Sequence, residues 1–186
     1  MPLPADAHPL VKLPAAEAAL VQRVRELVAT HIGPDAQRVA QEDVFAWDTF
    51  RTLAREGIVA TAFPRAYGGT DARQALRIRI IEELGRVCST SASIITGTDL
   101  SSRAIVAGAS DELKAQIVPG LCSGELQAAF ALTEPGAGSD VRGLQTLMRR
   151  RDGGYTVNGR KKFITRASTA DWFAVVGKIE DEPSNF

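Results

Sequence analysis

Apolar residues in the first two-thirds of the chain recur every three or four positions, the spacing of one face of an amphipathic α-helix. The first such face starts near Ala15 and carries Leu20, Val21, Val24, Leu27 and Val28. Gly33-Pro34 predicts the end of this helix, because proline disfavours helical backbone in the residue before it. Residues 1–14 are rich in proline and show little periodicity, so we expect an N-terminal arm there.

The same spacing predicts further helices, separated by turn residues. Their expected ranges are 34–45, 47–55, 71–87, 89–107 and 111–118. Ser110 is a good N-cap for the last of these helices, and Pro119-Gly120 is expected to close it. Residues 58–64 are expected to form a short extended link, and Tyr67-Gly-Gly-Thr70 is typical of a turn.

The period changes near residue 124, after which short apolar runs alternate with turn residues such as Asn158-Gly159. The runs that predict strands are 126–132, 144–148, 155–157, 163–165 and 172–176. We therefore expect an α+β fold, in which an all-helical N-terminal bundle is followed by a partial antiparallel β domain. The expected boundaries are an arm at 1–14, a helical domain at 15–124 and an incomplete β domain at 125–186.

Composition is that of an ordinary globular protein, with 45% hydrophobic and 24% charged residues in a chain of 186. Lys plus Arg and Asp plus Glu each number 22, so the formal net charge is zero, which argues against a nucleic-acid-binding protein. The basic run Arg149-Arg150-Arg151 is therefore interpreted as a solvated strand end or turn. A patch that faces a phosphate group is the alternative.

Cysteine and histidine usage gives no sign of a metal site, because Cys88 and Cys122 form no CxxC pair and lie far from His8 and His31. The two cysteines are interpreted as buried thiols of a reducing compartment, with a disulfide between them left open. No apolar run approaches the ~20 residues of a membrane span, and the N-terminus has no signal-peptide pattern. The expected location is the cytoplasm.

Candidate chemistry lies in the stretch Ala131-Leu-Thr-Glu-Pro-Gly-Ala-Gly-Ser-Asp140. A strand that ends in a hydroxyl and runs into a glycine-rich turn can aim successive backbone N–H groups at one anion. Thr133 could then bond a ring heteroatom and Ser139 a phosphate oxygen. The alternative is a plain tight turn in which Glu134 and Asp140 are solvated.

Other kinds of site fit this stretch poorly. It lacks the dinucleotide fingerprint, since strands rather than a helix follow it, and it lacks the lysine of a P-loop. Glu134 and Asp140 have no histidine or third acid near them in sequence, so acid–base catalysis by either is disfavoured. Ser139 has no base nearby, which disfavours a hydrolase.

A second candidate segment is Phe163-Ile164-Thr165. On a strand, Phe163 and Thr165 would lie on the same side, where the ring could cover a flat cofactor and the hydroxyl could reach its edge. The alternative is a core phenylalanine on a half-buried strand. Trp172 is interpreted as sheet core.

Several stretches together resemble the acyl-CoA dehydrogenase family. Residues 131–140 look like the signature of its flavin-binding β domain, and Gly159-Arg-Lys-Lys-Phe-Ile-Thr165 looks like its second signature. Three upstream stretches match its helical domain in order and spacing: Phe63-Pro-Arg-Ala-Tyr-Gly-Gly69, Glu82-Glu-Leu-Gly-Arg86 and Pro119-Gly-Leu-Cys-Ser-Gly124. The resemblance covers the chain after the N-terminal arm.

The resemblance implies FAD as cofactor and the α,β-dehydrogenation of an acyl-CoA or another acyl thioester, in a homo- or hetero-oligomer. The implied cofactor-binding residues are Phe130, Leu132, Thr133, Gly138, Ser139, Phe163, Ile164 and Thr165. Thr133 would contact the pyrimidine edge of the flavin, Phe163 its ring face, and Thr165 its N5 region. Ser139 would contact the pyrophosphate of FAD or the pantetheine part of the substrate.

Arg166 departs from the family pattern, because the family often has a small polar residue after Thr165. The helix implied to line the acyl pocket is residues 91–105, and the polar Asp99 within it leaves the length and nature of the acyl group open. The family glutamate that acts as base lies in a C-terminal helical domain, so no catalytic residue is assigned in residues 1–186. We expect a partner chain or a longer polypeptide to supply that domain.

Two other functions remain open at this point. The same fold could serve a flavin oxidase, a monooxygenase or a dehydrogenase of acyl-carrier-protein substrates. The chain could also be an inactive, cofactor-free interaction module.

Overall fold

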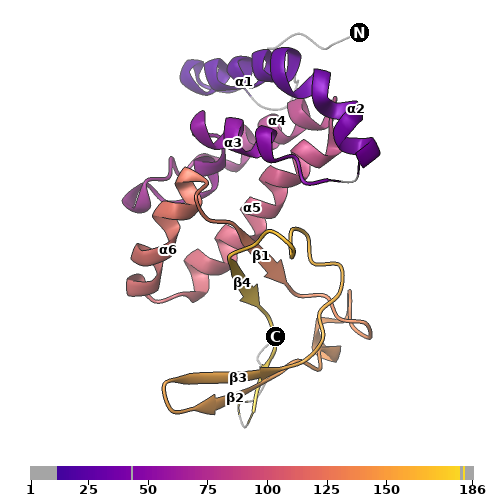
Figure 1. Ribbon diagram of the computed structural model, residues 1–186. Coiled ribbons are helices and arrows are strands. Elements are labelled where there is room, and N and C mark those ends of the chain that lie inside the picture. Colours follow the sequence, from indigo (N-terminus) through magenta and orange to yellow (C-terminus); the bar gives the residue numbers. More distant parts are fainter. Residues whose placement is uncertain (1–11, 43, 181, 183–186) are drawn as a thin grey trace. The chain divides into compact units, whose positions relative to one another are not determined.

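The structure is a computed structural model that describes residues 12–42, 44–180 and 182. Most of the expected N-terminal arm, residues 1–11, lies outside the described residues. The chain divides into two compact units, Met1–Leu126 and Gln127–Phe186. The first unit is helical and the second holds the strands (Figure 1).

The helical unit contains six α-helices and three short helical turns in its described residues. The α-helices are α1 (Ala15–Leu27), α2 (Gly33–Glu42), α3 (Trp47–Arg55), α4 (Gln74–Gly85), α5 (Ser89–Gly108) and α6 (Asp111–Ser123). A π-helical turn, η1 (Val28–Ile32), joins α1 to α2. The 3₁₀ turns η2 (Val59–Ala62) and η3 (Arg65–Tyr67) join α3 to α4.

The expected helix end at Gly33-Pro34 is wrong, because helical backbone continues through it with Gly33 at φ −60° and ψ −47°. In a regular α-helix the ring of Pro34 would clash with the carbonyl four residues earlier, and the π turn widens the backbone just ahead of it. Glycine is needed at position 33, since a Cβ there would lie 2.9 Å from the Val28 carbonyl oxygen.

The expected end of α6 at Pro119-Gly120 is also wrong. The helix runs on to Ser123 and stops at Gly124, whose φ of +79° is the left-handed conformation of a glycine C-cap. Buried Val118 and Leu121 lie on either side of the proline, and their burial offsets the hydrogen bond that Pro119 cannot make. The expected N-cap is confirmed, because the Ser110 hydroxyl accepts a hydrogen bond of 3.2 Å from Leu113 N–H.

The link after α3 is a 3₁₀ turn, where the sequence predicted an extended run. Ile58, Val59 and Thr61 are all buried, and a helical turn lets consecutive residues enter the core that an extended strand would split between two sides. The Thr61 hydroxyl donates to the Ile58 carbonyl at 2.6 Å, which satisfies it locally. Gly68, at φ +91°, confirms the expected turn.

The core of the helical unit lies where α4 packs against both α1 and α5. Its fully buried members include Val24, Leu53, Ile58, Ile80 and Leu84. Each such side chain contributes roughly 1.5–3 kcal/mol of transfer free energy, so this cluster dominates the stability of the unit. Cys88 and Cys122 are buried and free, and burial raises the pKa of the Cys122 thiol to about 11.

The β unit contains two small sheets. Its strands are β1 (Ala128–Ala131), β2 (Leu147–Arg151), β3 (Gly154–Asn158), β4 (Trp172–Val175) and β5 (Lys178–Ile179). β1 pairs with β4 in parallel, with Ala128 opposite Trp172 and Ala131 opposite Val175. β2 forms an antiparallel hairpin with β3 and pairs in parallel with β5.

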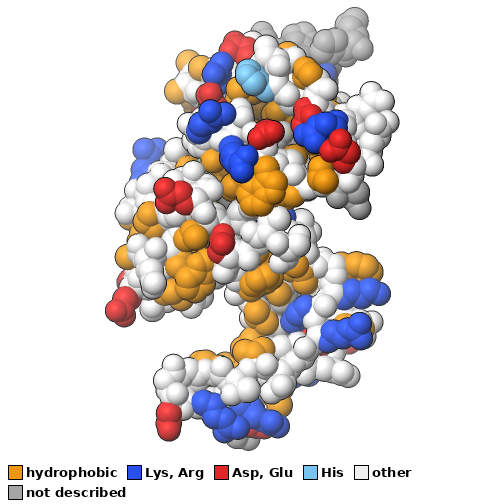
Figure 2. All heavy atoms as spheres, viewed as in Figure 1, with side chains coloured by type: hydrophobic (Ala, Val, Ile, Leu, Met, Phe, Trp, Pro, Cys, Tyr) orange, Lys and Arg blue, Asp and Glu red, His pale blue; other side chains and the backbone are white. Residues whose placement is uncertain are grey.

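The α+β fold class is confirmed, and antiparallel pairing holds for the β2–β3 hairpin. The other two pairings are parallel, which local turn signals could not predict because the paired strands are far apart in sequence. Figure 2 shows the basic side chains gathered at this hairpin. Arg149 and Arg150 there pair with Glu180 and Glu182 at 2.7 and 2.9 Å, as expected for a solvated strand end.

The expected strand at 163–165 is wrong. Phe163 has a φ of +57° and residues 165–169 form turns, so the segment belongs to no sheet. The Lys162 N–H instead donates to the Thr133 carbonyl at 2.8 Å, and Ala167 N–H donates to the Ile164 carbonyl at 3.1 Å. Contacts to the end of β1 therefore shape this segment.

Candidate functional site

The end of β1 leads directly into a tight turn made by Glu134-Pro135-Gly136-Ala137. The Glu134 N–H donates to the Ala137 carbonyl at 2.9 Å, and the Ala137 N–H returns a bond of 3.2 Å. Proline with its fixed φ and a following glycine are the residues that such a turn favours. Gly138 and Ser139 follow the turn directly, and both are exposed.

Neither Gly136 nor Gly138 is required by the packing of this chain. A Cβ at either position would meet nothing within 4 Å, and neither residue has a positive φ. Within the described part of the chain, the N–H groups of Gly138 and Ser139 and the Ser139 hydroxyl have no hydrogen-bond partner. The turn therefore offers free donors beside open space, which is the arrangement that binds an anion such as a phosphate.

Glu134 is buried, so the alternative of two solvated carboxylates is wrong for this residue. Its Oε2 accepts from Gln145 N–H at 2.6 Å, and its Oε1 accepts from Thr146 N–H, the Thr146 hydroxyl and Lys161 Nζ at 3.0, 2.5 and 2.8 Å. Burial acts to raise the pKa of the Glu134 carboxyl, but the hydrogen bonds from Lys161, Thr146 and Gln145 outweigh it and lower the pKa to about 2. The group is a structural anion and not a general base at neutral pH.

The segment from Lys161 to Arg166 is tied to β1 at both ends. Lys161 Nζ donates to the Leu132 carbonyl at 2.8 Å, and the next residue, Lys162, bonds the Thr133 carbonyl. At the other end, the Arg166 guanidinium donates to the Ala128 carbonyl at 2.9 Å. The two sequence stretches that carry the candidate residues therefore lie side by side within the β unit.

Phe163 stands out from this segment with 80% of its surface exposed. Lys162 Nζ lies 4.4 Å from the centre of its ring, a cation–π contact. Thr165 is exposed, and its hydroxyl has no partner within the described part of the chain. Phe163 and Thr165 do not lie on one side of a strand, contrary to the prediction, but both side chains are exposed and can contact a ligand.

The candidate residues therefore fall into two groups. Thr133 and the segment Phe163–Thr165 are brought together by the Lys162 bond, while Gly138 and Ser139 follow on the turn. Phe130 and Leu132, on or just after β1, are half-buried, as is Ile164. No local pattern around Lys161, Thr146 or Arg166 signals the contacts that these residues make, so their anchoring roles were not predicted.

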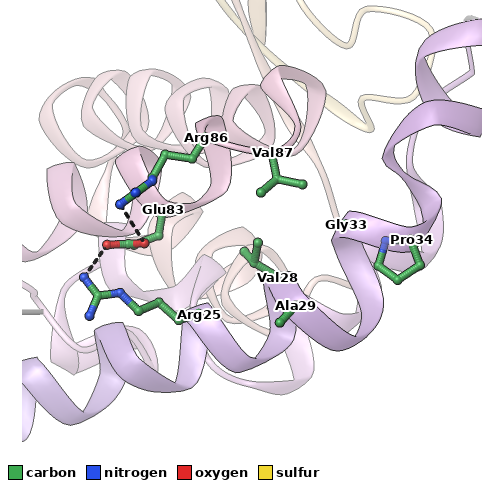
Figure 3. A pocket seen from close by; sticks show the side chains of 8 residues that line it. All are labelled: Arg25, Val28, Ala29, Gly33, Pro34, Glu83, Arg86 and Val87. Carbon is green, nitrogen blue, oxygen red and sulfur yellow. Dashed lines mark hydrogen bonds and ion pairs between the residues drawn. The ribbon is translucent and has the colours of Figure 1, made fainter. Parts of the chain in front are cut away.

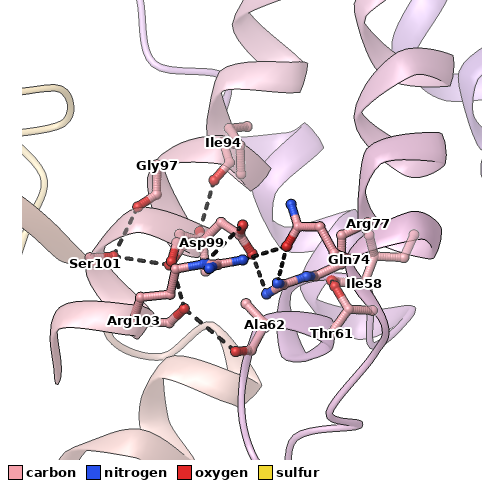
Figure 4. A network of polar contacts seen from close by, with 12 residues as sticks. Ile58, Thr61, Ala62, Gln74, Arg77, Ile94, Gly97, Asp99, Ser101 and Arg103 are labelled. Carbon is pink, nitrogen blue, oxygen red and sulfur yellow. Dashed lines mark hydrogen bonds and ion pairs between the residues drawn. The ribbon is translucent and has the colours of Figure 1, made fainter. Parts of the chain in front are cut away.

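In the helical unit, Asp99 on α5 belongs to an ion-pair network, which explains its polar side chain (Figure 4). Asp99 accepts from Arg77 of α4 at 2.5 Å and lies 3.7 Å from Arg103. Both arginines also donate to Gln74, and the Ser102 hydroxyl bonds the Asp99 carbonyl at 2.9 Å. Arg77 is 8% exposed, so a charged cluster is built into this part of the α4–α5 contact.

An open cleft of about 700 Å³ lies between the α1–α2 region and α4 (Figure 3). Its apolar lining comes from Val28, Ala29, Pro34 and Val87. On one side Glu83 pairs with Arg25 at 2.6 Å and lies 3.8 Å from Arg86. None of the residues predicted from sequence to bind a ligand lines this cleft.

The described residues contain no group of three or more His, Cys, Asp or Glu side chains placed to hold a metal ion. None of their helices is long and apolar enough to cross a lipid bilayer.

Helices followed by small sheets, with free hydroxyls and backbone donors at a strand end, define a two-unit α+β protein with a candidate cofactor-binding turn. The N-terminal domain of acyl-CoA dehydrogenases matches residues 14–125, and the middle domain of the same enzymes matches residues 129–185. The chain belongs to the acyl-CoA dehydrogenase family.

Curated relatives agree with this assignment. The chain is 34% identical over 161 residues to cyclohex-1-ene-1-carbonyl-CoA dehydrogenase of Geobacter metallireducens, which covers 86% of the chain and 42% of that relative. It is 32% identical over 149 residues to an acyl-CoA dehydrogenase of Bacillus subtilis, at 80% and 39% coverage. The chain thus spans about two-fifths of the length of these relatives.

Solved structures show the same fold. An acyl-CoA dehydrogenase of Bacillus anthracis complexed with FAD superposes with a TM-score of 0.82 at 27% identity, over 92% of this chain and 30% of that one. The FAD complex of PigA superposes with a TM-score of 0.83 at 26% identity, over 94% and 46%. The solved relatives therefore include proteins that bind FAD.

Proposed function

We propose that this chain supplies one wall of the FAD site of an acyl-CoA dehydrogenase, which oxidises an acyl thioester between its α and β carbons. The observation that carries the proposal is the junction of the Thr133–Ser139 stretch with the Phe163–Thr165 segment, which the Lys162–Thr133 bond joins at 2.8 Å. Free donors, open space at Gly136 and Gly138, and an exposed aromatic ring fit a planar cofactor that carries phosphates.

Each residue has a proposed role. Phe163 covers one face of the flavin ring, and the hydroxyls of Thr133 and Thr165 bond its polar edges. Gly138 and Ser139 donate to the pyrophosphate of FAD or to the pantetheine part of the thioester. Phe130, Leu132 and Ile164 line the ring with apolar surface and backbone groups. Each role matches the burial or exposure of its residue in the β unit.

When bound, FAD supplies the acceptor for the hydride that leaves the β carbon of the substrate. The residues of this chain would hold the ring and shield the ring face on the Phe163 side from water. No residue in 1–186 is proposed as the base that removes the α proton, and Glu134 is excluded from that role by its low pKa and its four hydrogen bonds. We propose that a C-terminal helical domain provides the base.

The acyl group is proposed to be short or to carry a polar atom. In this proposal α5 lines the acyl pocket, and the Arg77–Asp99 pair places two charged side chains on the α4–α5 side of it. A pocket wall that contains charged side chains favours an acyl group with a polar atom over a long alkyl chain, which could offer these side chains no hydrogen bond. One solved relative, PigA, has been determined with FAD and proline, which is a small ligand with polar atoms.

A titration with FAD tests the proposed site. We expect the purified 186-residue chain to bind FAD, quench its fluorescence and shift the amide resonances of Thr133, Ser139 and Phe163–Thr165. Riboflavin, which lacks the phosphates, is expected to shift the resonances of Thr133 and Phe163–Thr165 but not that of Ser139. A chain that leaves all of these resonances unchanged at millimolar FAD would contradict the proposal.

A turnover assay separates the dehydrogenase from the oxidase and monooxygenase. After the chain is combined with the C-terminal domain of a relative, we expect reduction of an artificial electron acceptor by short-chain acyl-CoA. Oxygen consumption without that acceptor would favour the oxidase or monooxygenase. Activity on acyl-carrier-protein thioesters alone would change the proposed carrier.

A further inference from the structure

Two consecutive carbonyls at the end of β1 are held by two consecutive lysines. Lys161 bonds the Leu132 carbonyl through its side chain, and Lys162 bonds the Thr133 carbonyl through its backbone, both at 2.8 Å. The two lysines therefore tie the start of the Phe163–Thr165 segment to the end of β1.

Glu134 fixes that position. The Lys161 ammonium bridges Glu134 Oε1 and the Leu132 carbonyl, and the side chains of Glu134 and Lys161 are only 5% and 13% exposed. The same carboxylate bonds three donors of Gln145 and Thr146, which lead into β2. A buried charge pair in which both partners make further hydrogen bonds holds its geometry firmly, because loss of either partner would leave the other charge buried and unpaired.

The segment that follows is under backbone strain. Phe163 and Arg166 have φ values of +57° and +66°, a region that L-residues with a Cβ rarely occupy and that persists only where neighbouring contacts impose it. The imposing contacts are the Lys162–Thr133 bond before Phe163 and the Arg166–Ala128 bond after Thr165. Strain held by such contacts is typical of a pre-shaped ligand site.

We propose that Glu134 and Lys161 are positioning residues that pre-form the flavin wall, holding Thr133 and the strained Phe163–Thr165 segment at the separation the ring requires. The pair acts through these residues and does not itself contact the cofactor. The inference rests on the proposed function, since the ligand it serves is FAD.

The test uses the full 186-residue chain and two readouts. Without flavin, hydrogen exchange of the Lys162 amide reports whether the segment stays on β1, with the Val157 amide of the β2–β3 hairpin as an internal reference. With flavin, FAD affinity and the visible spectrum of the bound flavin report the shape of the wall. The variants are Glu134→Gln, Lys161→Met and Lys161→Arg.

Two further variants keep the test decisive. Thr146→Val removes one hydrogen bond to Glu134 but leaves the Lys161 bridge, so it is the matched control for lost stability. The double variant Glu134→Gln/Lys161→Met leaves no buried charge stranded, so it is expected to fold even where Lys161→Met does not.

In Glu134→Gln and in the double variant we expect exchange of the Lys162 amide to accelerate and the FAD dissociation constant to rise on the order of tenfold, as for loss of a charge-assisted bond. The flavin band should also shift. Lys161→Arg should restore most of the affinity, and Thr146→Val should change it by less than about twofold.

The outcomes separate the two proposals. If the wild-type chain binds FAD and the double variant matches it in affinity, spectrum and Lys162 exchange, the positioning role is wrong and the flavin site stands. If Thr146→Val weakens FAD as much as the double variant does, stability rather than positioning explains the effect, and the role is again wrong. If the wild-type chain never binds FAD, the proposed function fails, and the flavin role of the pair fails with it.

Discussion

At the scale of single residues, the β unit depends on very close packing around Thr146. A Cβ added to Gly159 would lie 2.2 Å from the Thr146 hydroxyl oxygen and 2.7 Å from its Cα, too close for any side chain. Because the same hydroxyl bonds Glu134, the clash would be transmitted to the buried carboxylate. Gly159 is thus required by its neighbour rather than by its backbone angles.

We therefore expect Gly159→Ala to destabilise the β unit by about 1–3 kcal/mol, the usual cost of overpacking. The matched control is Gly154→Ala in β3, where a Cβ meets nothing within 4 Å and no positive φ is involved. Urea unfolding followed by the resonances of the β2–β3 hairpin measures both variants. Equal stabilities for the two would show that Thr146 can move aside.

The low pKa of the Glu134 carboxyl predicts how the stability of the β unit depends on pH. Its pKa is lowered from 4.5 to about 2 in the folded chain, so the folded state binds its proton less readily than the unfolded state. The stabilisation, about 3 kcal/mol, is fully present above about pH 5 and is lost as the pH falls toward 2. Unfolding of the wild-type chain should show this loss. Glu134→Gln should lack it, and identical pH profiles would contradict the assignment.

The burial of Glu134 could not be predicted from its neighbours in sequence. Pro135 and Gly136 signal a turn, and a carboxylate beside a turn is ordinarily solvated. Its partners Thr146 and Lys161 lie 12 and 27 residues away, so the fold alone brings them together. The hydroxyls of Thr133, Ser139 and Thr165, by contrast, could be proposed as ligand contacts from sequence because they belong to the two signature stretches, and their roles stay predictions.

At the scale of elements, helices were predictable where they end in strong local signals. The range Trp47–Arg55 was predicted as observed. In the structure, Gly57 closes the turn after α3 with a φ of +70°. The helix ends predicted at Gly33-Pro34 and at Pro119 were wrong. A π turn accommodates Pro34, and the buried residues before and after Pro119 outweigh the preference of proline for ending a helix. The run 163–165 failed as a strand because its bonds go to the end of β1.

The N-cap of α6 gives a prediction at this scale. Ser110→Ala leaves the Leu113 N–H without its side-chain acceptor, and the expected loss is about 1 kcal/mol of helical-unit stability. Ser110→Asp keeps an acceptor and adds a charge that favours the helix N-terminus, so it should be at least as stable as the wild type. Urea unfolding of the helical unit, followed by circular dichroism, tests the pair. A stable alanine variant would mean that water caps the helix as well.

At the scale of the whole molecule, the two units carry different groups of candidate residues. The helical unit carries the Arg77–Asp99 cluster, and the β unit carries every residue proposed to hold FAD. A ligand that binds only the folded β unit should raise the stability of that unit by mass action, by about 2.7 kcal/mol at a concentration of 100 times the dissociation constant. The response of each unit to a ligand is therefore a direct test of where the ligand binds.

The same stability response distinguishes the phosphate-binding part of the proposed wall from the part that covers the flavin ring. Ser139→Ala removes a donor proposed for phosphate, so it should weaken FAD binding several-fold and leave riboflavin binding unchanged.

Phe163→Ala removes the side chain that is proposed to cover the ring, so it should weaken the binding of both ligands, by roughly 0.5–1.5 kcal/mol beyond the lost apolar contact. Phe163 is 80% exposed in the free chain, so its loss should not lower the stability of the ligand-free β unit. Thermal unfolding with each ligand measures all three effects. If Ser139→Ala weakened riboflavin as much as FAD, Ser139 would lie at the ring rather than at the phosphates.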